Sequence, residues 1–107
     1  MPTDNICTIV KEVKETLSGI YGSRLKGLIL YGSCARGDAD DSSDIDMLAL
    51  LQSCRDPMIE RTEYFESIWR LGLKYDTVIS IMPIDEEDYG NGGSPLILNA
   101  KKEGVSL

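Results

Sequence analysis

The sequence predicts a mixed α/β domain, in which helices pack against a small β-sheet. Apolar residues recur at helical spacing over residues 4–21 and again after residue 57. Three apolar runs, at 25–31, 44–51 and 75–82, are short enough to be buried strands, and turn-forming residues separate them. Helices and strands therefore alternate along the chain, which favours one small sheet with helices on it.

The N-terminal segment, residues 4–21, predicts an amphipathic helix, because its apolar side chains share one helical face and charged side chains lie opposite. The apolar face consists of Ile6, Ile9, Val10, Val13, Leu17 and Ile20. Gly22 is suited to end this helix. The run at 25–31 then predicts the first strand, although its periodicity alone also permits a helix.

The segment after the second strand predicts another helix, because Asp56 can cap its N-terminus and Pro57 fits the first helical position. Its apolar side chains continue to about residue 73. We expect two of them, Phe65 and Trp69, to lie in the core. A helix between the second and third strands permits a parallel crossover between them.

The C-terminal third begins with a strand rich in β-branched residues, which Pro83 ends. A polar, glycine-rich connection follows, and Ser94 with Pro95 predicts a last short helix that stops at Gly104. We expect residues 1–107 to form a single domain.

Charge and composition limit the ligands and partners that this chain is expected to bind. The formal net charge is -7, and such an acidic surface repels polyanions, so we expect no stable nucleic-acid binding. The chain has no histidine, which excludes His-based triads and makes oxygen ligands, as for Mg2+, the expected metal ligands. The three cysteines have no metal-binding spacing, and no long apolar run or signal peptide is evident. We therefore expect a cytoplasmic protein without a membrane span.

Two carboxylates, Asp44 and Asp46, stand one residue apart at the head of the second strand. Side chains alternate along a strand, so both point to one face, roughly 6.5–7 Å apart. Their like charges repel unless a divalent cation lies beside them. Two such ions form the usual clamp for phosphoryl or nucleotidyl transfer. Asp76, at the head of the third predicted strand, would join the pair if that strand lies beside the second.

The turn before Asp44 and Asp46 carries groups that can bind phosphate, which complements a metal-binding pair. Gly32 and Ser33 end the first strand, and glycine lets the backbone approach a ligand closely. The amides of the following turn, the Ser33 hydroxyl and the Arg36 guanidinium can bind phosphate oxygens. Each feature alone is weak evidence, because Gly-Ser turns and Asp-x-Asp pairs are common. Their spacing, order and strand context together predict a nucleotide site.

The stretch GSCARGDADDSSDIDMLAL, residues 32–50, resembles the nucleotidyltransferase signature, in which ten residues separate Gly-Ser from Asp-x-Asp. The superfamily is that of DNA polymerase β, and the chain is similar to its minimal nucleotidyltransferase (MNT) domains. YDTVISI resembles the strand that carries the third carboxylate, and PLILNAKKEGVSL resembles the closing helix. The resemblance implies the polymerase β-like nucleotidyltransferase fold, a small mixed sheet flanked by helices.

The resemblance also implies roles for the matching residues. Gly32 and Ser33 would contact the phosphates of a nucleoside triphosphate, and Asp44 and Asp46 would hold two Mg2+ ions. Asp76 would complete the catalytic metal site and help to deprotonate the acceptor hydroxyl. That hydroxyl would attack the α-phosphate, and pyrophosphate would leave.

Stand-alone MNT domains resemble antitoxins that pair with HEPN-domain toxins. This resemblance implies transfer of AMP from ATP to a tyrosine of a HEPN-like toxin protein. Two alternatives stay open: a binding module that neutralises or regulates a partner by contact alone, and nucleotidyl transfer to a small molecule such as an aminoglycoside. Tyr31, Tyr75 and Tyr89 are candidates for stacking on the base, and an oligomer is compatible with the sequence.

Overall fold

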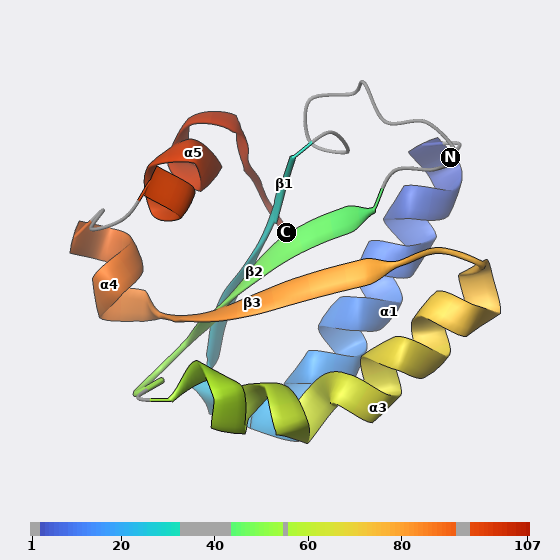
Figure 1. Cartoon of the computed structure of the whole chain (residues 1–107), viewed down its shortest axis with the longest axis horizontal. Coiled ribbons are helices and arrows are strands. Elements are labelled where there is room, and N and C mark those ends of the chain that lie inside the picture. The colour runs from blue at the N-terminus through green and yellow to red at the C-terminus, as the bar shows by residue number, and fades with distance from the viewer. Residues whose placement is uncertain (1–2, 33–43, 55, 92–94) are drawn as a thin grey trace.

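The computed structural model describes residues 3–32, 44–54, 56–91 and 95–107. Its strands form a four-stranded sheet in the order β3-β2-β1-β4, in which β2 and β3 are parallel and the other neighbours antiparallel (Figure 1). The mixed α/β fold class predicted from the sequence is thus confirmed. The elements are α1 Thr3–Tyr21, the 3-10 helix η1 Gly22–Arg24, β1 Leu25–Tyr31, β2 Ile45–Leu51, α3 Pro57–Tyr75, β3 Ile79–Asp85, α4 Glu86–Asn91, α5 Pro95–Glu103 and β4 Val105–Ser106.

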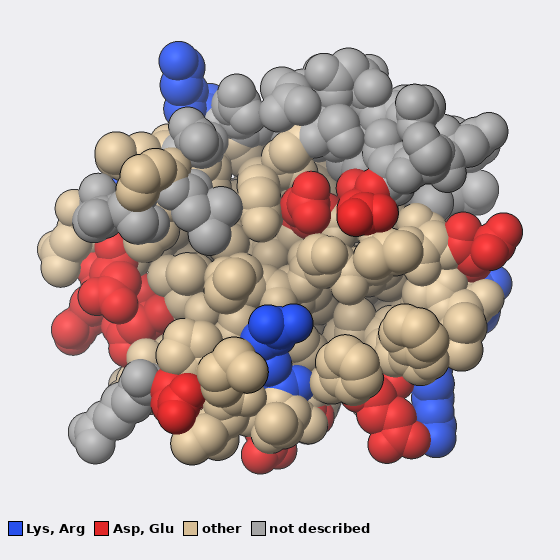
Figure 2. All heavy atoms as spheres, in the orientation of Figure 1, with Lys and Arg blue, Asp and Glu red and all other residues tan. Residues whose placement is uncertain are grey.

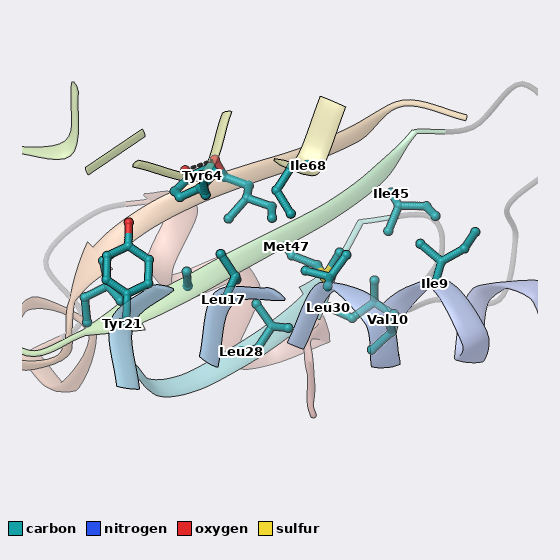
Figure 3. Packing of buried hydrophobic residues seen from close by; sticks show 14 of the residues in the cluster. Ile9, Val10, Leu17, Tyr21, Leu28, Leu30, Ile45, Met47, Tyr64 and Ile68 are labelled. Carbon is teal, nitrogen blue, oxygen red and sulfur yellow. Dashed lines mark hydrogen bonds between the residues drawn. The ribbon is translucent and has the colours of Figure 1, made fainter. Parts of the chain in front are cut away.

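One face of the sheet carries the main core. Alternate residues of β2, among them Ile45 and Met47, point to this face and are fully buried. Helices α1 and α3 cover it, and their apolar side chains meet those of β1 and β2 between the two layers (Figure 3). The labelled side chains in that view are Ile9, Val10, Leu17, Tyr21, Leu28, Leu30, Ile45, Met47, Tyr64 and Ile68.

The described helices cover part of the opposite face of the sheet. Ile29 of β1 and Leu48 of β2 pack there against Ala100 of α5, with Tyr89 of α4 beside them. A side chain at Gly104 would collide with the Ala100 carbonyl and with Ile29, so this glycine lets the end of α5 approach β1. Helix α4 follows the end of β3, and α5 lies beside β1 (Figure 1).

Helix α3 begins as the sequence predicts, because the Asp56 carboxylate accepts a hydrogen bond from the Met58 amide at 3.0 Å. Its buried face differs from the prediction. The residues that α3 buries are Glu60, Tyr64, Ile68 and Gly72. Phe65 and Trp69 are 60% and 59% exposed, so their predicted place in the core is wrong. Each of them follows a buried residue, Tyr64 or Ile68, by one position. They therefore form a second row on the helix, which does not face the main core.

Strand β3 starts later than predicted. Helix α3 runs to Tyr75, and Asp76 closes it in the left-handed region at φ 52, with its amide donating to carbonyls of the last helical turn. The chain therefore reaches the sheet only at Ile79, and the predicted strand start at residue 75 is wrong. The predicted polar connection after the strand also contains helix α4, which Asp85 caps by accepting from the Glu87 amide at 2.9 Å. None of the helices in the described ranges is long and apolar enough to cross a membrane.

Candidate active site

Asp44 and Asp46 lie where β2 begins. In the ladder, Asp46 stands opposite Tyr31 of β1 and opposite Ser80 of β3. Its side chain shares the face of Leu48, which α5 covers further along the strand. Around Asp46 itself this cover is absent in the described part of the chain: Asp44 and Ser80 are exposed, and Asp46 and Tyr31 are half-buried. Figure 2 shows acidic side chains gathered there, next to the residues that are not described.

Gly32 lies directly against the Asp46 carboxylate. It adopts the left-handed conformation, at φ 76, and a Cβ atom added to it would stand 2.9 Å from Asp46 Oδ2. The backbone conformation therefore favours glycine here, and a Cβ atom would force the Asp46 carboxylate to move. The structure brings together the first residue of the Gly-Ser pair and the second carboxylate of the Asp-x-Asp pair, although 14 positions separate them in the sequence.

The electrostatics of the pair suit a divalent cation. Burial, with a further contribution from the Asp44 charge, raises the pKa of the Asp46 carboxyl above its ordinary value. Burial and the Asp46 charge likewise raise the pKa of the Tyr31 hydroxyl. A cation between the two carboxylates would relieve this repulsion, and carboxylate oxygens are the ligands that Mg2+ prefers. The donor set therefore fits the metal that the sequence predicts.

Asp76, the third predicted carboxylate, is not the residue that the strand register places beside this pair. Asp76 lies at the end of α3, and the position of β3 beside Asp46 belongs to Ser80 instead. Among the described residues, no three Asp, Glu, Cys or His side chains are grouped closely enough to hold a metal ion. Ser33 and Arg36 lie outside the described residues, so their predicted phosphate contacts stay predictions.

The structure places two further residues, Ser80 and Tyr31, beside Asp46 in the candidate site. Ser80 lies on β3 next to Asp46, a position that no sequence motif marks because it depends on the strand register. Tyr31, one of the three stacking candidates, lies next to Asp46 on the other side. Tyr89 packs against the same small cluster as Tyr31, whereas Tyr75 packs against the main core. Both Tyr31 and Ser80 line a hollow of about 310 Å³ that opens between β3 and α3.

Comparison with known proteins identifies the family of this chain. The nucleotidyltransferase domain family matches residues 6–98, and the chain belongs to this family. The chain is 40% identical over 75 residues, 70% of its own length and 75% of the relative's, to "Putative protein adenylyltransferase MJ0141" of Methanocaldococcus jannaschii. The protein is thus a nucleotidyltransferase enzyme.

Solved structures show the same fold. A "putative minimal nucleotidyltransferase" superposes with a TM-score of 0.61 at 22% identity, over 100% of this chain and 97% of the other. A toxin–antitoxin complex with AMP-PNP superposes with a TM-score of 0.58 at 16% identity, over 99% of this chain and 72% of the other. The resemblance to MNT domains seen in the sequence is confirmed.

Proposed function

We propose that this chain transfers AMP from ATP to a tyrosine hydroxyl of a HEPN-type toxin partner, in a Mg2+-dependent reaction that neutralises the toxin. The close approach of Gly32 to the Asp46 carboxylate supports the proposal, because a turn that would bind phosphate and a pair that would bind metal need to be neighbours. The relative named as a protein adenylyltransferase supports a protein acceptor, and the toxin–antitoxin complex with AMP-PNP supports a toxin partner and an adenine nucleotide.

In this proposal Asp44 and Asp46 hold the metal, while Gly32, Ser33 and Arg36 bind the triphosphate. Bound Mg2+ would neutralise the phosphate charge and assist the departure of pyrophosphate. The acceptor oxygen forms a bond to the α-phosphorus, the bond from that phosphorus to the bridging oxygen breaks, and a carboxylate of the site takes the hydroxyl proton. Tyr31 and Ser80 flank the pair and would bound the space in which the acceptor lies.

The role of Asp76 as a third metal ligand stays a prediction from the resemblance, and its place at the end of α3 weighs against it. The variant Asp76→Asn tests the role directly. If Asp76 is a third metal ligand, Asp76→Asn should lose as much activity as Asp46→Asn. If Asp76 only ends α3, the variant should lose little activity. Because the register of β2 and β3 places Ser80, and not Asp76, beside Asp46, we expect the smaller effect.

The test of the proposed function combines α-labelled ATP, Mg2+ and the protein encoded by the neighbouring gene. We expect label on a tyrosine of that protein with the wild-type chain, and none with Asp44→Asn/Asp46→Asn. The pair Glu87→Gln/Asp88→Asn is the matched control, because it removes two exposed acidic charges from α4. No label on a bound partner, or equal label with the Asp44/Asp46 variant, would contradict the proposal.

Neutralisation by contact alone is the second candidate, and the exposed Phe65 and Trp69 side chains favour it. The two candidates differ in cells that express the partner. If Asp44→Asn/Asp46→Asn still neutralises the partner fully, contact is the mechanism. If it fails although it still binds, chemistry is the mechanism.

A further inference from the structure

Helix α3 carries a row of large apolar side chains that the described residues leave exposed. Phe65, Trp69 and Leu73, here called the α3 row, are spaced four residues apart, and each is at least 59% exposed. The Phe65 and Trp69 rings stack, with their centroids 6.3 Å apart. Val78 and Met82 of the neighbouring β3 segment are exposed as well. A contiguous apolar patch of this kind marks an interaction site in a globular protein.

The α3 row borders two hollows that together form a groove between α3 and β3. The first, of about 310 Å³, is lined by Tyr31, Phe65, Trp69 and Ser80 among others. The second, of about 260 Å³, is lined by Trp69, Leu73 and residues 76–79. Trp69 belongs to both, and Tyr31 and Ser80 are the ladder neighbours of Asp46. The α3–β3 groove therefore runs from the candidate active site along α3.

The groove suits a helix better than an added strand. The Tyr64 hydroxyl donates a 2.9 Å hydrogen bond to the Ile81 carbonyl, and Pro83 has no amide hydrogen. Both features reduce the pairing capacity of the β3 edge, which is how proteins protect edge strands. The four-residue spacing of the α3 row instead forms a ridge of the type that packs into the groove of another helix.

Charge indicates what kind of helix fits. The chain has a formal net charge of -7, so two copies of it repel each other. Asp76 lines the groove near the end of α3, and Arg61 lines it near the start of the helix. Asp44 and Asp46 lie on the neighbouring strand, level with the start of β3. Glu66 is exposed next to Phe65 on α3, where it pairs with Arg70. In Figure 2 uncharged atoms fill the middle of this face around a basic side chain, and acidic side chains surround them. The complementary surface is apolar with a basic border.

We propose that the α3–β3 groove is the docking surface for the acceptor protein, which contributes a basic amphipathic helix that lies along the α3 row. This inference rests on the proposed function and deepens it, because a helix held there delivers its protein next to Tyr31, Ser80 and Asp46. Trp69 is the anchor of the surface, since exposed tryptophans at the centre of an interface carry a large share of the binding energy.

Trp69 is the single tryptophan of the chain, so it can report on the groove directly. The chain is labelled with 5-fluorotryptophan and titrated, by 19F NMR, with the protein encoded by the neighbouring gene. We expect a saturable shift of the single resonance. Phe65→Ser/Leu73→Ser should weaken binding by at least about tenfold, and Glu66→Lys should weaken it while reducing its salt dependence.

The matched control is Leu98→Ser, which removes an apolar side chain of similar exposure, 56%, from α5. It should bind like the wild type. An unchanged resonance with a partner that co-elutes, or equal binding by Phe65→Ser/Leu73→Ser, would overturn the inference. A shift that depends on the chain's own concentration would assign the groove to a second copy and overturn it as well.

The outcome separates this inference from the proposed function. If AMP is transferred but neither the resonance nor the groove variants respond, the docking surface is wrong and the transfer reaction stands. If the resonance shifts but wild-type protein transfers no AMP, the reaction is wrong and the docking surface stands. If the partner does not bind at all, both are contradicted.

Discussion

Asp46 and Met47 are neighbours in the chain but lie on opposite faces of β2, and the two faces are built for different purposes. Met47 is completely buried between the sheet and helices α1 and α3. Asp46 lies on the other face, beyond the cover of α4 and α5, with a second carboxylate two residues away. One face maximises burial and the other keeps like charges together, which is the pattern expected where function opposes stability.

The largest effect should come from Asp46→Asn. We expect AMP transfer to fall by roughly 10³-fold or more, about 4 kcal/mol in the activation barrier, because in the proposed site a metal ligand would lose its charge. Labelled transfer under saturating ATP measures this effect, with circular dichroism to show that the variant is folded. Activity within about tenfold of wild type would show that the pair is not the metal site.

The complementary change, Met47→Ala, should act on stability. Met47 is completely buried, so removing its side chain should lower the free energy of unfolding by about 2–5 kcal/mol. Urea denaturation measures this loss. Transfer per folded molecule should stay close to wild type, and a selective loss of activity at full stability would break the distinction between the two faces.

Two glycines extend the comparison. Gly32 and Gly22 both have positive φ, but only Gly32 has a neighbour within reach of an added Cβ, namely Asp46 Oδ2 at 2.9 Å. Both Gly22→Ala and Gly32→Ala should cost about 1–2 kcal/mol in backbone strain. Only Gly32→Ala should also reduce transfer, by about 10–100-fold, because it displaces the carboxylate. Equal activity of the two variants would remove Gly32 from the site.

The smallest effect is a pH dependence of stability in metal-free buffer. The pKa of Asp46 is raised in the folded state, so the folded chain holds this proton more tightly than the unfolded chain does. The resulting stabilisation is present at low pH and is lost as the pH rises through the folded-state pKa. At pH 7 Asp46→Asn should therefore be more stable than wild type, by less than about 1 kcal/mol because solvent screens the group.

Thermal melts with EDTA measure this difference. The advantage of Asp46→Asn should disappear below the ordinary Asp pKa of 3.8. A variant that is less stable than wild type at pH 7 would mean that Asp46 is held by stabilising contacts instead.

The sequence predicts the elements whose signals are local. The cap at Asp56 and the alternation along β2 each depend on a few adjacent residues, and both appear in the structure. The position of Asp76 depends on where α3 ends, and the run YDTVISI reads as strand although its first residues close the helix. Ser80 depends on the register between β2 and β3, and register is a long-range property.

The exposed α3 row shows a further limit of periodicity. Phe65 and Trp69 and the buried Tyr64 and Ile68 form adjacent rows with the same four-residue spacing. Periodicity indicates that α3 has an apolar side but does not decide which row meets the core. Packing against α1 and β3 decides it, and Tyr64 is selected in part because its hydroxyl reaches the Ile81 carbonyl.

The proposed reaction requires that Asp44 and Asp46, on the part of the sheet that the described helices leave open, bind metal and triphosphate. Calorimetric titration of Mn2+ with a non-hydrolysable ATP analogue tests this claim most directly on wild type, Asp46→Asn and Met47→Ala. We expect uptake by wild type and by folded Met47→Ala, and none by Asp46→Asn. Equal uptake by all three proteins, or uptake by none, would contradict it.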